Sequence, residues 1–298
     1  MKRILITGKG SYIGTSVEKW LLQYPDTYLV DTLDMMGSNW MQTAFAGYDT
    51  VFHVAGIAHA DVGNVSEERR QLYYQVNRDL AVKTARKAKA EGVKLFIYMS
   101  SIIVYGNGKG IHKKRNILES TEPSPDNFYG DSKLQAEREL EKLDDEKFHI
   151  GILRPPMIYG KGSKGNYQIL SRLACRTPIF PYIRNERSML YIENFCEFVR
   201  LVIEQGESGL WFPQNAEYVR TSEMVQYIAM VHGKTIWVTS MFNGIIYILA
   251  HIPGKIGGLV YKAFGSLTYD KTLSEQSKIA VSSYQMKNLY ESIKQTEE

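Results

Sequence analysis

The first 155 residues alternate short apolar runs with longer segments in which apolar residues recur at helical spacing. Runs that are apolar throughout indicate strands buried on both faces, as in a parallel sheet. The pattern predicts strands at residues 3–7, 28–33, 50–54, 95–99 and 149–153. It predicts helices at residues 12–23, 39–46, 67–90 and 132–142. This alternation is typical of an α/β fold, with a doubly wound parallel sheet covered by helices on both faces.

Beyond residue 156 the pattern is less regular and indicates a smaller lobe. It predicts helices at residues 167–175, 192–204 and 221–232, and a short strand within 177–186. The most apolar late stretch, residues 241–264, is interrupted by polar residues and Pro253. Its longest uninterrupted piece is about eight residues, well short of the roughly 20 that cross a bilayer. We therefore expect no transmembrane segment and interpret this stretch as part of the core.

Composition narrows the class of protein. Of 298 residues, 44% are hydrophobic and 23% are charged, which excludes disordered and fibrous chains. Cys175 and Cys196 are too few for a disulfide framework or a cysteine-rich zinc site, so we expect no metal and a reducing compartment. The chain shows no signal peptide, which favours the cytoplasm. The net charge of +4 suits an anionic small molecule and gives little support for nucleic-acid binding.

A glycine-rich segment lies between the first predicted strand and the first predicted helix. It comprises Gly8, Gly10, Ser11, Tyr12, Ile13 and Gly14. A dinucleotide-binding fold needs glycines here for the tight turn, for close approach of backbone N–H groups to a diphosphate, and for helix–strand packing. The helix N-terminus then faces the phosphates with its partial positive charge. The segment therefore predicts a cofactor loop in a Rossmann-type sheet.

An acidic residue near the end of the second strand is expected to bind the hydroxyls of the adenosine ribose. Asp31 and Asp34 both qualify, at 17 and 20 residues after Gly14, and the spacing does not decide between them. Neither is followed closely by an arginine or lysine that could neutralise a 2′-phosphate. This favours NAD over NADP as the cofactor.

Three residues form the predicted catalytic group. Ser101 follows the fourth predicted strand, Tyr129 comes 28 residues later, and Lys133 stands four residues after that tyrosine, on the same helix face. A nearby ammonium stabilises a phenolate, so we expect a lowered pKa for Tyr129 and use of its phenol as an acid or base near neutral pH. A serine at the carboxyl end of a strand is placed to hydrogen-bond the same substrate oxygen.

Taken together, these motifs resemble those of an extended short-chain dehydrogenase/reductase of the NAD-dependent sugar epimerase/dehydratase family. The resemblance covers nearly the whole chain. Its marks are residues 7–14, 53–56 (HVAG), 76–77 (VN), 100–106 (SSIIVYG), 129–133 (YGDSK), 153–160 (LRPPMIYG), and Arg187 with 190–192 (LYI). These marks are specific for the family and less specific for the reaction.

The resemblance implies a role for each matching residue. Tyr129 would be the acid/base, Lys133 would hold the nicotinamide ribose, and Ser101 would bond the reacting oxygen of the sugar. Arg187 would clamp the diphosphate of a nucleotide sugar, because a guanidinium fork suits phosphate oxygens. Asn166 would contact the sugar nucleotide. Four further residues would line or brace the cofactor site: Ala55, Gly56, Asn77 and Pro156. For Asn77 a purely structural bridge is the alternative.

Two departures from the family pattern concern the cofactor side. Ser11 stands where the family loop usually has its middle glycine, and we expect an altered turn that still binds. The stretch from residue 20 to 49 is short for a second and a third strand with their helix, and merger of the two strands is one explanation. On this basis we assign Asp31 to the ribose, and Asp34 and Met35 to the adenine edge.

The resemblance also implies how the chain is organised. Residues 1–155 would form the NAD-binding Rossmann domain and would also receive residues 187–205. Residues 156–298 would form mainly a substrate-binding lobe. Relatives commonly form homodimers through a four-helix contact, for which residues 67–90 and 132–142 are the candidates.

The residues after Ser101 separate the reactions of the family. Its 4,6-dehydratases carry an Asp-Glu pair there and its decarboxylating members a glutamate, whereas this chain has Ile102 and Ile103. Without a spare acid or base, 4-epimerisation and reduction of a 4-keto sugar nucleotide remain. The NAD preference favours a 4-epimerase of a UDP-hexose or UDP-N-acetylhexosamine, acting through a transient 4-keto sugar with bound NAD.

Three alternatives stay open. Gly265, Ser266, Leu267 and Asp270 resemble a C-terminal stretch of some NAD(P)H-dependent 4-keto-sugar reductases. A non-catalytic NAD-sensing protein is disfavoured, because such relatives typically lose the Tyr/Lys pair. Docking of residues 245–264 on a membrane surface, close to polysaccharide-assembly machinery, is a separate hypothesis.

Overall fold

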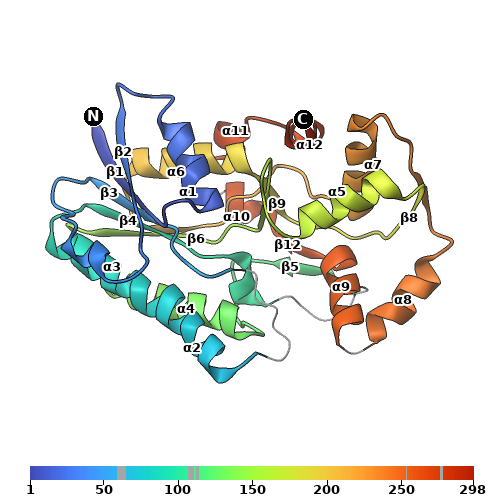
Figure 1. Ribbon diagram of the computed structural model, residues 1–298, viewed down its shortest axis with the longest axis horizontal. Coiled ribbons are helices and arrows are strands. Elements are labelled where there is room, and N and C mark those ends of the chain that lie inside the picture. Colours follow the sequence, from blue (N-terminus) through green and yellow to red (C-terminus); the bar gives the residue numbers. More distant parts are fainter. Residues whose placement is uncertain (59–64, 107–110, 112–113, 253, 276–277) are drawn as a thin grey trace.

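Six parallel strands form the central sheet of the computed structural model, in the order β10-β6-β4-β3-β1-β2 (Figure 1). The strands are β1 (Lys2–Thr7), β2 (Tyr28–Leu33), β3 (Thr50–His53), β4 (Leu95–Met99), β6 (His149–Leu153) and β10 (Gly209–Trp211). The structure describes residues 1–298 except 59–64, 107–110, 112–113, 253 and 276–277. The five strands predicted for the first half are all present, and the predicted doubly wound α/β fold is confirmed.

Alternating residues of the strands face two separate layers of helices, because successive side chains of a strand point to opposite faces. Ile4 and Ile6 belong to the core on the side of α1 and α6, whereas Leu5 belongs to the core on the side of α3 and α4. Figure 1 shows α1 and α6 above the sheet and α2, α3 and α4 below it. These helices are α1 (Tyr12–Leu21), α2 (Glu67–Tyr74), α3 (Leu80–Ala90), α4 (Phe128–Glu141) and α6 (Ile192–Gln205), and a π-helical turn (Gln75–Asp79) joins α2 to α3.

The order of the strands reverses at β1. The chain leaves β1 for β2 on one side and comes back for β3 on the other side. In open α/β sheets, ligands bind outside the carboxyl ends of the strands at such a reversal. β1 ends directly before Gly8, and β3 ends directly before Val54. The glycine segment and the segment after β3 therefore lie at the expected ligand-binding edge.

The short connection between α1 and β3 contains one strand, β2, at the edge of the sheet. The helix predicted at residues 39–46 is wrong, because only a 3-10 helix (Asn39–Gln42) forms there. The carboxylate of Glu91 accepts hydrogen bonds from the backbone N–H groups of Phe45 and Ala46, the latter at 3.2 Å. These N–H groups are thereby satisfied by a side chain and do not continue a helix.

Helix α4, which carries Tyr129, begins at Phe128 and not at the predicted residue 132. Asn127 caps it, since its side chain accepts a hydrogen bond from the backbone N–H of Gly130 at 2.9 Å. A Cβ on Gly130 would lie 2.7 Å from the carbonyl oxygen of Ile103. Glycine at this position therefore allows the first turn of α4 to pack against the segment that follows β4.

A smaller lobe lies on the right in Figure 1. It contains three pairs of short parallel strands: β5 (Arg115–Ile117) with β12 (Leu267–Tyr269), β7 (Met157–Tyr159) with β9 (Met189–Tyr191), and β8 (Ile179–Pro181) with β11 (Trp237–Thr239). Its helices are α5 (Asn166–Arg176), α7 (Thr221–Val231), α8 (Asn243–His251) and α9 (Lys255–Phe264). Three short helices follow: α10 (Lys271–Glu275), α11 (Val281–Tyr284), which packs on α6, and α12 (Leu289–Glu297), which packs on α7. Helices α5, α6 and α7 match the predicted ones to within one residue at each end. Over the described part of the chain, no helix is long and apolar enough to cross a membrane.

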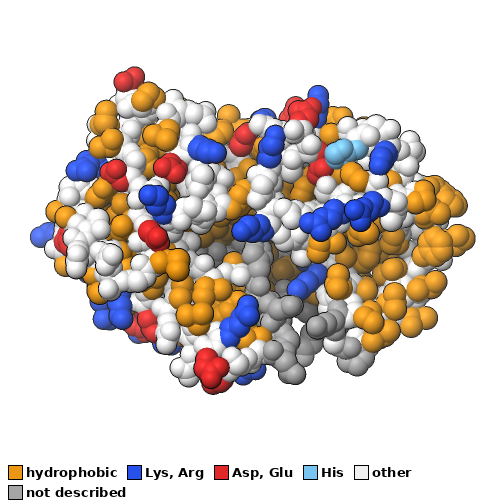
Figure 2. Space-filling model, in the orientation of Figure 1, with side chains coloured by type: hydrophobic (Ala, Val, Ile, Leu, Met, Phe, Trp, Pro, Cys, Tyr) orange, Lys and Arg blue, Asp and Glu red, His pale blue; other side chains and the backbone are white. Residues whose placement is uncertain are grey.

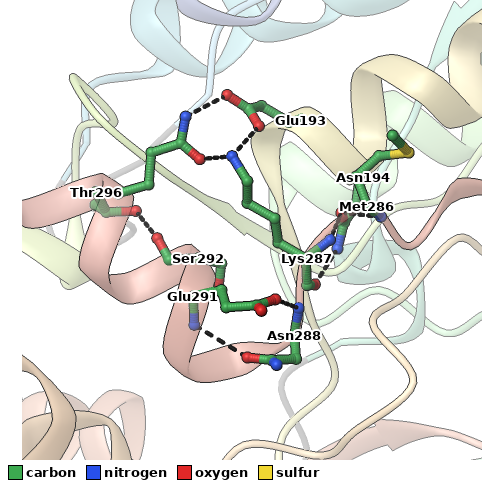
Figure 3. Close-up of polar contacts among 9 residues, drawn as sticks. Glu193, Asn194, Met286, Lys287, Asn288, Glu291, Ser292 and Thr296 are labelled. Carbon is green, nitrogen blue, oxygen red and sulfur yellow. Dashed lines mark hydrogen bonds and ion pairs between the residues drawn. The ribbon is translucent and has the colours of Figure 1, made fainter.

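Polar contacts fasten the C-terminal helix α12 to α6 (Figure 3). Asn194 of α6 accepts a hydrogen bond from the backbone N–H of Lys287 at 3.2 Å, and the ammonium of Lys287 pairs with Glu193 at 2.9 Å. Helix α12 begins with a reciprocal cap in which the side chains of Asn288 and Glu291 each accept the other residue's backbone N–H at 3.0 Å. The end of the chain thus returns to a helix that covers the central sheet.

Candidate active site

Gly8 and Gly10 shape the turn between β1 and α1. Both have a positive φ, 86° and 76°, which favours glycine. A Cβ on Gly8 would lie 2.9 Å from the backbone nitrogen of Ala55, so this glycine lets the loops after β1 and β3 touch. A Cβ on Gly10 would meet open space. Ser11 caps α1 by accepting a hydrogen bond from the N–H of Gly14 at 3.1 Å, so the departure from the family glycine supplies a helix cap.

The start of α1 fits an anionic ligand. Within the described residues, no acceptor takes up the backbone N–H groups of Gly10, Tyr12 and Ile13. The buried hydroxyl of Tyr12 has no partner there either. Free N–H groups at the positive end of a helix bind phosphate oxygens. The loop therefore fits the diphosphate of a dinucleotide.

The two candidate ribose ligands occupy different positions. Asp31 lies inside β2, and its carboxylate accepts a hydrogen bond from the hydroxyl of Tyr48 at 2.8 Å. Asp34 directly follows Leu33, the last residue of β2, whose carbonyl oxygen accepts the N–H of Gly8 at 2.9 Å. Asp34 therefore stands at the carboxyl end of the strand, beside the glycine loop. This placement favours Asp34 for the ribose, which differs from our assignment of Asp31.

Asn77 braces the segment after β3 against α4. Its buried side chain accepts from the N–H of Ile57 at 2.9 Å and donates to the hydroxyl of Ser132 at 3.1 Å. A Cβ on Gly56 would lie 3.0 Å from Asn77 Oδ1 and 3.3 Å from Lys133 Nζ, so a larger residue here would press on both side chains. Asn77 lies in the π-helical turn, a distortion that is frequent at functional sites. Its contacts are those of a structural bridge at the edge of the candidate site.

Ser101, Tyr129 and Lys133 come together beyond the carboxyl end of β4. The hydroxyl of Ser101 lies close enough to the phenol of Tyr129 to oppose the rise in its pKa that burial causes. The same hydroxyl accepts the backbone N–H of Ile103 at 3.3 Å, which fixes the serine at the start of a 3-10 helix. The ammonium of Lys133 donates to the carbonyl oxygen of Met99, the last residue of β4, at 2.8 Å. The three residues that the sequence proposed for catalysis are therefore neighbours.

Burial is the largest influence on the pKa values of Tyr129 and Lys133. It raises the pKa of Tyr129 to about 12, although Ser101 acts in the opposite direction. Burial lowers the pKa of Lys133 to about 8, and the charge of Glu137 opposes that shift. The expectation of a lowered pKa for Tyr129 is therefore wrong for the protein alone. The ammonium of Lys133 bonds the carbonyl of Met99, and loss of water disfavours the phenolate, so the tyrosine is held protonated.

A buried polar network beneath the catalytic group was not predicted by any motif. Arg154 Nη2 lies 2.6 Å from Glu137 Oε2, and Arg154 Nη1 donates to the hydroxyl of Tyr105 at 2.7 Å. The hydroxyl of Ser100 donates to the other carboxylate oxygen of Glu137. The network ties α4, which carries Tyr129 and Lys133, to the ends of β4 and β6. One signal was present in the sequence, because Glu137 follows Lys133 by four residues and shares its helix face.

Arg187 joins two segments of the smaller lobe. It bridges Val219 in the antiparallel sense and Leu267 in the parallel sense, just before β9. Its guanidinium donates to the carbonyl oxygen of Lys262, near the end of α9. Burial lowers the pKa of Arg187, because its charged guanidinium is poorly solvated. An anion bound beside the guanidinium would offset this loss of solvation.

The remaining predicted site residues lie at several places. Met35, Ala55 and Pro156 are buried and follow the carboxyl ends of β2, β3 and β6. Asn166 is the first residue of α5. Among the described residues, no hydrogen bond joins Asn166 or Arg187 to the catalytic group, and no cluster of three His, Cys, Asp or Glu side chains is placed to hold a metal ion.

Comparison with known proteins assigns the family. Residues 4–211 match the NAD dependent epimerase/dehydratase family. The chain belongs to this family. Membership identifies it as an NAD-dependent enzyme, and the loop after β1 fits that cofactor.

Similar proteins agree with this assignment. A UDP-glucose 4-epimerase from Vibrio cholerae is 29% identical over 257 residues, which cover 79% of this chain and 77% of that protein. An N-acetyl-alpha-D-glucosaminyl-diphospho-ditrans,octacis-undecaprenol 4-epimerase from Escherichia coli O157:H7 is 29% identical over 227 residues, covering 69% of this chain and 64% of that protein. The crystal structure of a UDP-glucuronic acid 4-epimerase from Bacillus cereus in complex with NAD superimposes with a TM-score of 0.73 at 17% identity, covering 99% and 95% of the two chains. The last comparison shows the shared fold.

Proposed function

We propose that this family member is a nucleotide-sugar 4-epimerase that acts on a UDP-hexose or a UDP-N-acetylhexosamine. The observation that carries the proposal is the grouping of Ser101, Tyr129 and Lys133 beside Ile102 and Ile103. Such a site can move one proton and bind a keto oxygen, whereas Ile102 and Ile103 supply neither the acid nor the base that dehydration needs. Both curated relatives described above are named as 4-epimerases, which supports the same reaction.

In the proposed reaction, Tyr129 takes the proton of the sugar 4-hydroxyl group while Ser101 hydrogen-bonds the same oxygen. NAD, which the loop after β1 and Lys133 would hold, would supply reversible hydride chemistry at C4. Inversion would require the 4-keto sugar to turn in the site between the two hydride transfers. Tyr129 then gives the proton back to the oxygen. No atom is gained or lost, and only the configuration at C4 changes. Because Tyr129 is held protonated in the protein alone, its ionisation must be assisted when the site is filled, and Lys133 on the same helix face is the side chain placed to assist it.

We assign the cofactor contacts along the carboxyl edge of the sheet. Six residues of the loop after β1 would hold the diphosphate: Gly8, Gly10, Ser11, Tyr12, Ile13 and Gly14. Asp34 would bind the adenosine ribose in place of Asp31, and Met35 would line the adenine. Ala55, Gly56, Pro156 and Lys133 would surround the nicotinamide end, with Asn77 as their brace.

For the substrate, we assign Arg187 to the diphosphate and Asn166 to the sugar nucleotide. The partly buried guanidinium of Arg187 supports the first assignment. The group that carries the sugar diphosphate can differ between family members. The name of the E. coli relative gives a lipid, an undecaprenol, as that carrier, where other relatives have a nucleotide. Both carriers present the same sugar diphosphate to Arg187.

A 4-keto-sugar-nucleotide reductase is the second candidate. The segment that resembles such reductases lies against Glu186 and Arg187, since Leu267 bridges Arg187 and the hydroxyl of Ser266 accepts the N–H of Glu186 at 3.2 Å. The same catalytic group would then perform only the second half of the reaction, with NAD(P)H added as a reagent.

One experiment separates the two reactions. Purified protein is incubated with UDP-glucose, UDP-galactose and their N-acetyl forms without added cofactor, and the sugars are followed by proton NMR. Interconversion of a pair supports the epimerase. Conversion that requires both added NAD(P)H and a 4-keto sugar supports the reductase. The variant Tyr129→Phe should be inactive in either case.

We further propose a cytoplasmic homodimer with a role in polysaccharide biosynthesis. Cys175 and Cys196 are both free, as is usual in a reducing compartment. Helices α2, α3 and α4 lie side by side on one face of the sheet, the arrangement that a four-helix contact between two copies requires (Figure 1). Light scattering on the wild type and on Leu72→Glu, which changes an exposed apolar residue of α2, tests the dimer.

A further inference from the structure

Helix α8 presents an apolar stripe to solvent. Met241, Ile245, Ile248 and Ile252 recur at intervals of three and four residues, so they share one side of the helix and its flanks. Their exposed fractions are 68%, 57%, 69% and 38%. The opposite side of α8, which includes Tyr247, packs on the core. No residue of α8 is fully buried, so the interpretation of residues 241–264 as core holds only for this inner side, and the stripe is the side that faces away from the core.

Helix α9 extends the same kind of surface. Ile256 and Leu259 are 51% and 57% exposed, while Val260 and Phe264 pack on the core. Helices α8 and α9 pack against each other. Figure 2 shows apolar side chains gathered over both helices at the right of the molecule. We call the exposed residues of this region the α8–α9 face: Met241, Ile245, Ile248, Ile252, Ile256 and Leu259.

The segment that carries the α8–α9 face has basic residues but no acidic ones. Residues 224–269 contain no aspartate or glutamate. Lys234 and Lys262 are exposed within that stretch, and Arg172 and Arg176 are exposed on α5, over which Figure 2 shows a row of basic side chains. Trp237, in the strand that leads to α8, is 60% exposed. An apolar helix face with tryptophan and a basic border is typical of segments that lie in the interface of an anionic membrane.

We propose that the α8–α9 face docks on the surface of a lipid bilayer that contains anionic headgroups. The helices would lie in the interface, since α8 and α9 have only 9 and 10 residues. The charge pattern selects this occupant over a second copy of the chain. Two copies meeting through the same face would bring their basic borders together, whereas an anionic surface complements them.

Docking through this face would bring Arg187, the residue assigned to the substrate diphosphate, close to the membrane. The guanidinium of Arg187 donates to Lys262 of α9, and the hydroxyl of Thr221 donates to the carbonyl oxygen of Ala263 at 2.5 Å. The end of α9 is thus attached to the residue assigned to the diphosphate. A sugar diphosphate anchored in the bilayer would therefore reach Arg187 from the membrane side, an extension that rests on the proposed function.

Flotation with vesicles tests the docking. The full chain is mixed with vesicles of phosphatidylcholine alone, or with roughly a third phosphatidylglycerol, at low salt and at about 0.5 M salt. We expect the wild type to float with the anionic vesicles, and both neutral vesicles and high salt to reduce the bound fraction. The double variant Ile248→Asp/Leu259→Asp should bind ~10-fold more weakly or less, because it removes two exposed apolar side chains and adds two negative charges.

A matched variant controls for the added charge. Leu22→Asp changes an exposed leucine, 53% accessible, at the end of α1, and should float like the wild type. Thermal unfolding, and turnover of UDP-sugars in the absence of vesicles, should be the same for all three proteins. Loss of docking would therefore appear in flotation alone, whereas failure of the proposed function would appear as absence of UDP-sugar turnover. Absence of wild-type flotation on anionic vesicles, or equal flotation of the double variant, overturns the proposal. A vesicle-free dimer that the double variant dissociates also overturns it, because a second copy would then cover the face.

Discussion

Glu137 and Arg154 form an ion pair that is almost wholly hidden from water, with exposed side-chain fractions of 1% and 6%. The guanidinium also bonds Tyr105, and the carboxylate also bonds Ser100, so the remaining polar atoms of the pair have partners. Removal of one member of such a pair leaves a buried charge without compensation. The pair ties α4 to the end of β6, which makes the position of Tyr129 depend on it.

We expect Glu137→Gln to lower the free energy of unfolding by about 3 kcal/mol, because it leaves the Arg154 guanidinium buried beside a neutral amide. Urea denaturation measures the change. Glu139→Gln, two residues away on the exposed side of α4, should leave the stability unchanged. The double variant Glu137→Met/Arg154→Met should be more stable than Glu137→Gln. Equal effects of the two single variants would contradict the role given to the pair.

Tyr129→Phe should reduce kcat by about 10²- to 10⁴-fold, the usual contribution of a general acid or base. The ring is kept, so thermal unfolding should not change. Tyr73→Phe is the matched control, because Tyr73 is also buried and its ring centroid lies 6.1 Å from that of Tyr129. Activity assays with UDP-sugars compare the two variants. If Tyr73→Phe were as inactive as Tyr129→Phe, the loss would reflect packing and not proton transfer.

The buried Lys133 should make folding stability depend on pH. Its pKa is about 8 in the folded protein against 10.5 for the free side chain, so between these values the unfolded chain holds a proton that the folded chain has released. The free energy of unfolding therefore rises with pH from about 8 towards 10.5, by up to about 3 kcal/mol. Tyr129 acts in the opposite direction only above pH 10, because its pKa is raised to about 12.

Urea unfolding at pH 7.5 and 9.5 measures this rise. Lys133→Met removes the titrating group, so the stability of this variant should increase less than that of the wild type over the same interval. The difference between the two slopes isolates the contribution of Lys133 from those of other groups. Parallel slopes would show that the ammonium is solvated in the folded protein.

The strands, the turn after β1 and the closeness of Ser101, Tyr129 and Lys133 could be predicted because each has a local sequence pattern. Apolar runs define the strands, and the spacing of Tyr129 and Lys133 gained weight from the glycine segment and from Ser101 after the fourth strand. The helix predicted at residues 39–46 failed because Glu91, which takes up the N–H groups of Phe45 and Ala46, lies 45 residues further along the chain.

The pKa values and the buried polar contacts of the site depend on tertiary contacts, which the spacing of residues along the chain does not reveal. The pKa of Tyr129 was predicted in the wrong direction because burial, which outweighs the other influences, is a property of the folded chain. The network of Ser100, Glu137 and Arg154 joins three elements and has no motif of its own. The choice between Asp31 and Asp34 required the end of β2, which periodicity locates only to within a few residues.

Asp34 should matter more for cofactor affinity than Asp31. A carboxylate that bonds ribose hydroxyls contributes about 1.5–3 kcal/mol, so Asp34→Ala should weaken NAD binding by roughly 10- to 150-fold. Asp31→Ala is the matched change three residues earlier. It removes the bond from Tyr48 at 2.8 Å and should leave NAD affinity within about 3-fold of the wild type, because that bond lies inside β2 and away from its carboxyl end. Titration calorimetry with NAD after release of bound cofactor measures both. A larger loss for Asp31→Ala than for Asp34→Ala would assign the ribose to Asp31 and would place the adenosine farther from the carboxyl end of β2 than the glycine loop indicates.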